Sequence, residues 1–183
     1  MIAATTKDGR IHLLDSAAIG GPAVRSAPYS SASDFMPGAL ATWQDAAGTR
    51  WILAPTAGPV AADANFPTSN GEVSNGAIVA WKVVERNGGA ALEPGWVSRD
   101  LVSPLTPIVI NGVVFAVSSG DRAQRSVPAV VYALDGATGK ELWSSGKTIT
   151  SFVHGGGLAG FAGQIYLGTH DGTLYSFGFP IEH

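Results

Sequence analysis

The chain has 183 residues, of which 24 are glycine and 11 are proline, and it contains no cysteine. The absence of cysteine excludes a disulfide-stapled fold, a thiolate zinc site and a thiol nucleophile. Charged residues make up only 14% of the chain and the formal net charge is −3, which excludes a charge-rich disordered protein and a basic nucleic-acid-binding domain. Because glycine and proline interrupt helices and build turns, this composition favours a turn-rich β protein.

No segment has the pattern of a membrane span or of a signal peptide. The longest nearly apolar stretch, residues 107–118, is too short to cross a bilayer and contains the hairpin signal Asn111-Gly112. The N-terminal residues do not combine a basic region with a following apolar region. We therefore expect no membrane span and no nucleic-acid partner.

Four segments repeat one pattern, in which two β-rich runs are joined by a connection. The second runs begin at Ile11, Ile78, Val131 and Leu174. In the first and last segments the connection contains Asp-Gly, a dipeptide that favours the left-handed backbone of a hairpin turn. In the second and third segments the connection lengthens to residues 57–75 and 119–127.

Further strands are predicted on both sides of these hairpins. Residues 38–44, 104–110 and 152–159 each precede a turn and a hairpin, residues 135–143 form a turn that leads into a fourth strand, and residues 95–97 are the counterpart of that strand. The alanines of residues 39–47 would also suit a helix, but the repeat favours a strand and a turn. Four antiparallel strands in each unit of roughly 40–50 residues are typical of a β-propeller blade. We predict an all-β fold of about four such blades, at residues 1–34, 35–100, 101–149 and 150–183.

The run VYALDGATGKELW at residues 131–143 resembles the tryptophan-docking motif of the pyrroloquinoline-quinone (PQQ) repeat β-propellers, and YLGTHDGTLY at 166–175 resembles their strand–turn–strand unit. The resemblance implies structural roles in the blades for Asp135, Thr138, Gly139, Trp143, Asp171 and Gly172. Asp135 and Thr138 can bond turn amides, and Gly139 can adopt a left-handed conformation. Trp143 and Trp96 are expected to pack in the core between blades.

The family's propellers have seven or eight blades, whereas the predicted units here amount to three and a half. The resemblance therefore implies the C-terminal half of a longer, extracytoplasmic or periplasmic protein, whose remaining blades would be its first partner. The alternative is a half-propeller that assembles with another copy of itself. In either case an open arc would expose a strand edge and an apolar sheet face.

The two long connections occupy the same position in adjacent units, so we expect them to emerge on one face. Residues 57–75 supply Asp63, Asn65, Asn70, Glu72 and Asn75, and residues 119–127 supply Asp121, Arg122, Gln124 and Arg125. These side chains either form a binding surface for a protein or a small molecule or are ordinary solvated loops. His154, before three glycines on the predicted innermost strand of the last unit, is a further candidate ligand contact, with a hydrated or packed histidine as the alternative.

Two functions follow from the resemblance. The favoured one is a non-catalytic binding scaffold that uses the loop face. The alternative is part of a quinoprotein dehydrogenase that oxidises an alcohol or sugar with PQQ and Ca²⁺, because a hard cation takes oxygen ligands and a carboxylate can accept the hydroxyl proton. Glu72 is the weak catalytic candidate, since it stands where the resemblance implies an aspartate. The residues themselves predict no metal site.

Overall fold

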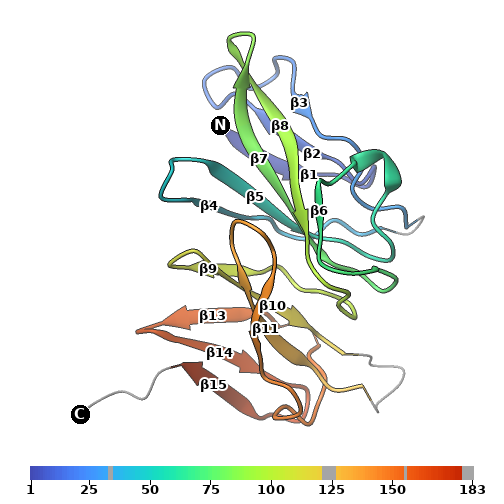
Figure 1. Cartoon of the computed structure of the whole chain (residues 1–183), viewed down its shortest axis with the longest axis vertical. Coiled ribbons are helices and arrows are strands. Elements are labelled where there is room, and N and C mark those ends of the chain that lie inside the picture. The colour runs from blue at the N-terminus through green and yellow to red at the C-terminus, as the bar shows by residue number, and fades with distance from the viewer. Residues whose placement is uncertain (33–34, 121–126, 155, 179–183) are drawn as a thin grey trace.

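The computed structural model describes residues 1–32, 35–120, 127–154 and 156–178. Within these ranges the chain forms 15 strands, one short 3₁₀-helix and no α-helix. This confirms the all-β prediction. The strands lie in four separate sheets, none of which closes on itself, and Figure 1 shows the sheets following one another in chain order from the upper to the lower end of the molecule.

The sheets are built from consecutive parts of the chain. The first contains β1 (Ile2–Thr5), β2 (Ile11–Leu14) and β3 (Val24–Arg25). The second contains, in spatial order, β4 (Ala41–Gln44), β5 (Arg50–Pro55), β7 (Ile78–Arg86), β8 (Gly89–Val97) and β6 (Thr68–Ser69). The third contains β9 (Ile108–Ile110), β10 (Val113–Ser118), β11 (Val130–Asp135) and β12 (Glu141–Ser144), and the fourth contains β13 (Leu158–Phe161), β14 (Gln164–Gly168) and β15 (Leu174–Gly178). The 3₁₀-helix η1 (Ala62–Ala64) precedes β6.

Neighbouring strands are antiparallel, with one exception. The exception is β6, which lies in the 57–75 connection and pairs parallel with β8. The sequence predicts only a loop there, because two exposed residues without an apolar alternation carry no strand signal. The third sheet has the expected four antiparallel strands, whereas β6 gives the second sheet a fifth.

Three apolar cores lie between consecutive sheets. The first joins β2 to the second sheet, the next joins β5, β7 and β8 to β10 and β11, and the last joins β10 and β11 to β14. Strands of the two middle sheets contribute to two cores, because successive side chains point to opposite faces. In β5, Trp51 and Leu53 face the third sheet, whereas Ile52 and Ala54 face the first. Burial on both faces explains why these strands read as nearly continuous apolar runs.

The segment 39–47 contains strand β4, which confirms the predicted strand over the helical alternative. Other predicted strand bounds need correction. Residues 152–159 were assigned to one strand, but the observed strand begins only at Leu158, because Phe152 and Val153 belong to a loop whose backbone bonds to neighbouring segments. The tight turn at Asn87-Gly88, with φ of 52° and 77°, joins β7 to β8 and was missed although Asn-Gly is a hairpin signal.

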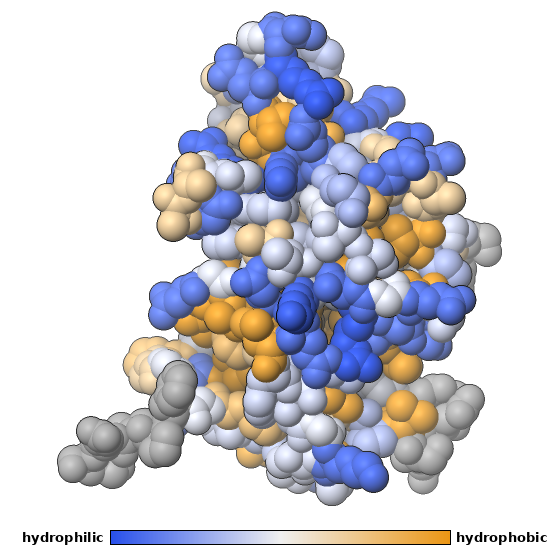
Figure 2. All heavy atoms as spheres, in the orientation of Figure 1, coloured by the Kyte–Doolittle hydropathy of each residue, from blue (hydrophilic) through white to orange (hydrophobic). Residues whose placement is uncertain are grey.

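The surface is polar except over parts of the sheets. Figure 2 shows apolar surface over the ends of β9 and β13 that lie on the left of Figure 1. Among the described residues the large apolar side chains with the greatest exposure are Phe161, Ile19, Met36 and Leu174. Phe161 and Leu174 both lie in the fourth sheet, so apolar surface remains at that end of the stack of sheets.

Candidate functional site

The two long connections start beside one cavity of about 440 Å³, which we call the loop-face hollow. It is formed where the segments before β4, β7, β9 and β13 meet the segments that follow β5 and β10. Its lining residues are Phe35, Met36, Gly38, Pro55, Thr56, Ala57, Asn75, Ser103, Pro104, Leu105, Thr106, Ser119, Val153 and His154. Polar and apolar groups share this surface almost equally, and the polar groups include hydroxyls, an amide and an imidazole.

Hydrogen bonds hold the walls of the loop-face hollow together. The Thr56 hydroxyl accepts a bond of 2.9 Å from the Ala77 N–H. Ser119 joins two further segments, because its hydroxyl donates to the Ser103 carbonyl at 2.7 Å and its own carbonyl accepts the Val153 N–H at 2.9 Å. Thr56 and Ser119 are both buried. The hollow is therefore preformed, as small-molecule and peptide sites commonly are.

Asn75 stands at the end of the 57–75 connection and is held by Asp100. The Asp100 carboxylate accepts the Asn75 N–H at 2.7 Å, the Asn75 amide at 2.6 Å and the Ser74 N–H at 2.9 Å. Burial raises the pKa of Asp100, but the bonds from Asn75 and Ser74 outweigh it, so the pKa lies below its usual value. Asn75 thus fixes the loop end while its exposed side chain borders the hollow.

The position of His154 corrects the sequence prediction. His154 precedes β13 and lies in an exposed loop, not on a strand. Its ring meets that of His170 edge-on, with centroids 6.3 Å apart, and His170 stacks on Phe152 at 4.5 Å. The loop follows from the backbone bonds that Phe152 and Val153 make to His170 and Ser119. His154 therefore reaches the loop-face hollow from its rim.

Asn70 and Glu72 lie at a second, more charged cavity of about 420 Å³. Its other lining residues are Gly71, Arg99, Asp100, Lys140 and Glu141. Asn70 is engaged, because its side-chain N–H groups donate to the Val97 and Thr138 carbonyls at 2.8 and 2.9 Å. Glu72 is exposed. The structure therefore separates Glu72 and Asn70 from Asn75 and His154, which share the loop-face hollow.

The remaining candidates of the loops lie elsewhere. Asp63 is an exposed residue of η1, and Asn65 ends that helix with φ of 49° and donates a bond of 3.1 Å to the Asp63 carbonyl. Asp121, Arg122 and Arg125, together with Gln124, lie outside the described residues. The described part of the 119–127 connection contributes Ser119 to the hollow.

The 135–140 turn of the third sheet contacts the second sheet through Trp96. The Trp96 indole N–H donates to the Gly136 carbonyl at 3.0 Å, and the ring lies against Gly139, whose φ is 72°. Asp135 accepts bonds of 2.9 and 2.7 Å from the N–H and hydroxyl of Thr138. These bonds shape the turn on which the buried indole rests.

The exposure of Trp143 contradicts the prediction of a core residue. Trp143 stands opposite Ala133, as Trp96 stands opposite Ala80, yet Trp143 is 43% exposed and Trp96 is fully buried. The difference arises from the next sheet. Trp96 is covered by the 135–140 turn of the third sheet, which leads into its fourth strand. The described part of the fourth sheet ends with its third strand and offers Trp143 no such turn. There Trp143 contacts Phe177, with ring centroids 5.5 Å apart.

The last hairpin is shaped by Asp171 and Gly172. Asp171 accepts bonds from the Thr169 hydroxyl at 2.6 Å and the Thr173 N–H at 3.2 Å, and these bonds lower its pKa. Gly172 has φ of 81°. Both residues are exposed and lie at the hairpin tip.

Among the described residues no three His, Asp or Glu side chains are placed to hold a metal ion. Within the same ranges no helix is long and apolar enough to cross a membrane. The loop-face hollow combines apolar side chains with nearly as much surface from groups that can form hydrogen bonds.

Sequence reasoning missed several residues of both cavities. Asp100 and Arg99 carry no motif of their own, and Lys140 lies within the 131–143 run, where only structural roles were expected. Phe35 and Ser119 enter the loop-face hollow from segments far apart in the chain. A sequence signal was available only for Asp100, which follows a predicted strand at the point where turn amides need an acceptor.

No protein-family model, curated protein or solved structure matches this chain. Function has to be inferred from the residues and their geometry.

Proposed function

We propose that the chain is part of a PQQ-repeat-type β-propeller and acts as a scaffold that binds a protein segment or a small molecule at its loop face. The observation that carries this proposal is the repeated junction between sheets. Consecutive sheets pack face to face through three separate cores, and Trp96 of one sheet docks on the turn of the next. Radially repeated small sheets with this packing are the architecture of a propeller.

The loop-face hollow supports a binding role in this architecture. Its apolar side chains include Met36, which is 72% exposed, and Leu105, while Asn75 and His154 are among its polar groups. Such a surface suits a short peptide segment or a compact apolar molecule with one or two hydrogen-bonding groups. An extracytoplasmic location and further blades, from a longer chain or from another copy, belong to the same proposal.

The test uses a random heptapeptide display library selected on the full chain. We expect the selected peptides to bind at least tenfold more weakly to the Met36→Asp variant, because a carboxylate in the hollow opposes apolar contact. Ile19→Asp is the matched control, because Ile19 is 73% exposed and does not line the hollow. Equal binding to the Met36→Asp variant would contradict the proposal.

A second measurement addresses the catalytic alternative. The chain is mixed with PQQ and Ca²⁺, and quinone absorbance and dye reduction with alcohols and sugars are recorded. We expect no substrate-dependent dye reduction. Turnover that disappears on Glu72→Gln would replace the binding proposal with the dehydrogenase.

A further inference from the structure

We call β4, β9 and β13, each the first strand of its sheet in the chain, the inner strands. They fill the space between neighbouring sheets at two of the three sheet–sheet boundaries, which we call junctions. Between the second and third sheets, Ala41 and Trp43 of β4 pack in the same core as Val109 of β9. Between the third and fourth sheets, Ile110 of β9 lies so close to Gly160 of β13 that a Cβ atom on this glycine would be 2.8 Å from Ile110 Cδ1. An inner strand on each side therefore closes these junctions.

The first junction lacks such a strand on one side. The strands β5, β10 and β14 each pair with an inner strand, β4, β9 or β13, but β1 ends its sheet and has no partner beyond it among the described residues. A hollow of about 780 Å³ remains there. We call the open edge of β1 together with this hollow the β1 groove.

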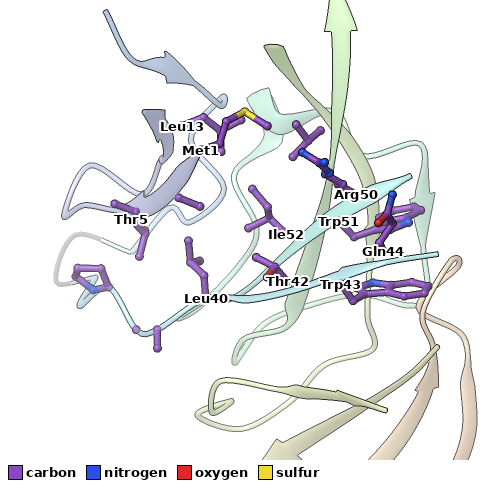
Figure 3. Close-up of a pocket in the computed structure, with 16 residues that line it drawn as sticks. Met1, Thr5, Leu13, Leu40, Thr42, Trp43, Gln44, Arg50, Trp51 and Ile52 are labelled. Atoms are coloured by element: carbon purple, nitrogen blue, oxygen red, sulfur yellow. The ribbon is translucent and has the colours of Figure 1, made fainter. Parts of the chain in front are cut away.

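Side chains of two sheets face each other across the β1 groove, as Figure 3 shows. Thr5 and Leu13 line it from the first sheet, and Leu40, Thr42 and Ile52 line it from the second. Ile52 is 3% exposed, so the floor is apolar, while the Thr42 side chain is exposed. The strand that is missing at this junction would place its own side chains opposite Leu40 and Thr42.

The backbone of β1 is oriented to accept a strand. The Thr6 N–H donates to the Arg10 carbonyl at 3.3 Å, so Thr6 and Arg10 form a hydrogen-bonded pair of the hairpin. Hydrogen-bonded and non-bonded pairs alternate along an antiparallel ladder, and Ala4 is therefore the next residue bonded to β2. The N–H and C=O groups of Ala3 and Thr5 therefore point to the open edge, where an added strand can form hydrogen bonds with them.

We propose that the β1 groove binds one extended peptide segment, which adds to β1 as an antiparallel strand. The segment spans at least four residues, the length of β1, or about 14 Å. Its alternate side chains are large and apolar, because those positions face Leu40 and Thr42 as Ile108 and Ile110 face the fourth sheet. Main-chain bonds supply affinity and the alternate side chains supply specificity, as in other cases of strand addition.

The probe is a fluorescent peptide that copies residues 105–112, which contain β9 and its turn. We expect saturable binding to the full chain and, in amide hydrogen exchange, slower exchange at Ala3 and Thr5 in the complex. The control peptide carries Ile108→Asp and Ile110→Asp and is expected to bind at least tenfold more weakly. No saturation up to about 1 mM peptide, or unchanged exchange at both amides, overturns the proposal.

A pair of protein variants locates the site. Thr42→Trp places an indole in the β1 groove and is expected to weaken peptide binding at least tenfold. Thr173→Trp is the matched control, because Thr173 is an exposed threonine of the last hairpin. Because Thr42 is itself exposed, the fold should tolerate the change. Equal binding to both variants would place the peptide on another strand edge and reject the β1 groove.

Discussion

At the scale of single residues, Asp100 holds the end of the 57–75 connection. Its carboxylate accepts three hydrogen bonds from Ser74 and Asn75. The pKa of Asp100 is lowered in the folded chain, so the ionised form stabilises the fold above the unfolded-state pKa. This contribution is lost as the pH falls through the folded-state pKa.

We therefore expect Asp100→Asn to lower the free energy of unfolding at pH 7 by about 1–2 kcal/mol, through loss of charged hydrogen bonds. The difference from the unsubstituted chain should shrink below about pH 4, where the carboxylate becomes protonated in the unfolded chain. Urea unfolding at several pH values measures both effects. Asp63→Asn, at an exposed residue of η1, is the control. A difference that stays constant from pH 7 to acid would contradict this account.

At the scale of elements, the contact between β8 and the 135–140 turn joins two sheets. Trp96 is completely buried and lies against Gly139, where a Cβ atom would be 2.3 Å from the indole Cε3. Trp143 occupies the corresponding place on β12 but remains partly exposed, since no such turn covers it among the described residues. The same residue type thus has two environments that only the neighbouring element distinguishes.

Gly139→Ala should destabilise the fold by about 3 kcal/mol or more, because it adds a clash with Trp96 to the strain of a left-handed alanine. Gly146 also has a positive φ, of 55°, but a Cβ atom there would meet nothing within 4 Å. Gly146→Ala should therefore cost only about 1 kcal/mol. Denaturant unfolding monitored by tryptophan fluorescence compares the two variants. Equal costs would show that backbone strain, and not the indole contact, determines the effect.

At the scale of the whole molecule, the position in the stack decides which sheet faces are covered. The residues that begin the second run of each repeat occupy equivalent positions in the four sheets. Ile11, Ile78 and Val131 are fully buried there, whereas Leu174 in the last sheet is 70% exposed. Each of the first three is covered by the next sheet. Within the described ranges no further sheet follows the fourth.

Ile78→Ala should lower the free energy of unfolding by about 2–5 kcal/mol, as expected for truncation of a buried aliphatic side chain. Leu174→Ala at the equivalent position should change it by less than about 0.5 kcal/mol. Thermal and urea unfolding of both variants measure the contrast. A large loss for Leu174→Ala would mean that another molecule covers the last sheet in solution.

Much of the strand pattern was predictable because it depends on local signals. Asp-Gly and Asn-Gly turns and continuous apolar runs indicate β7, β10, β11 and their neighbours, and the all-β class follows from them. The parallel strand β6 was not predictable, because its pairing with β8 is a contact between distant segments without a pattern of its own. The propeller and PQQ-repeat interpretation stays a prediction.

The candidate site was predictable only in part. Asn75 and His154 were selected for their chemistry and their position beside glycine-rich turns, and both line the loop-face hollow. Glu72 was selected with them, yet it lies at the charged cavity, because the connection turns between Glu72 and Asn75. Ser119 belongs to the 119–127 connection, which was expected on the same face as Asn75, whereas Phe35 could not have been grouped with them, since its proximity arises only when the sheets pack.

By itself, the sequence determined the all-β class, most of the turns and most of the strands. Turn dipeptides and apolar runs act over a few residues, so no distant contact is needed to interpret them. Only the tertiary structure decided that Trp96 is buried while Trp143 is exposed, that His154 leaves the strand, and that β1 keeps an open edge. Each of these outcomes depends on whether a neighbouring sheet supplies a covering surface, which is a property of the packed assembly.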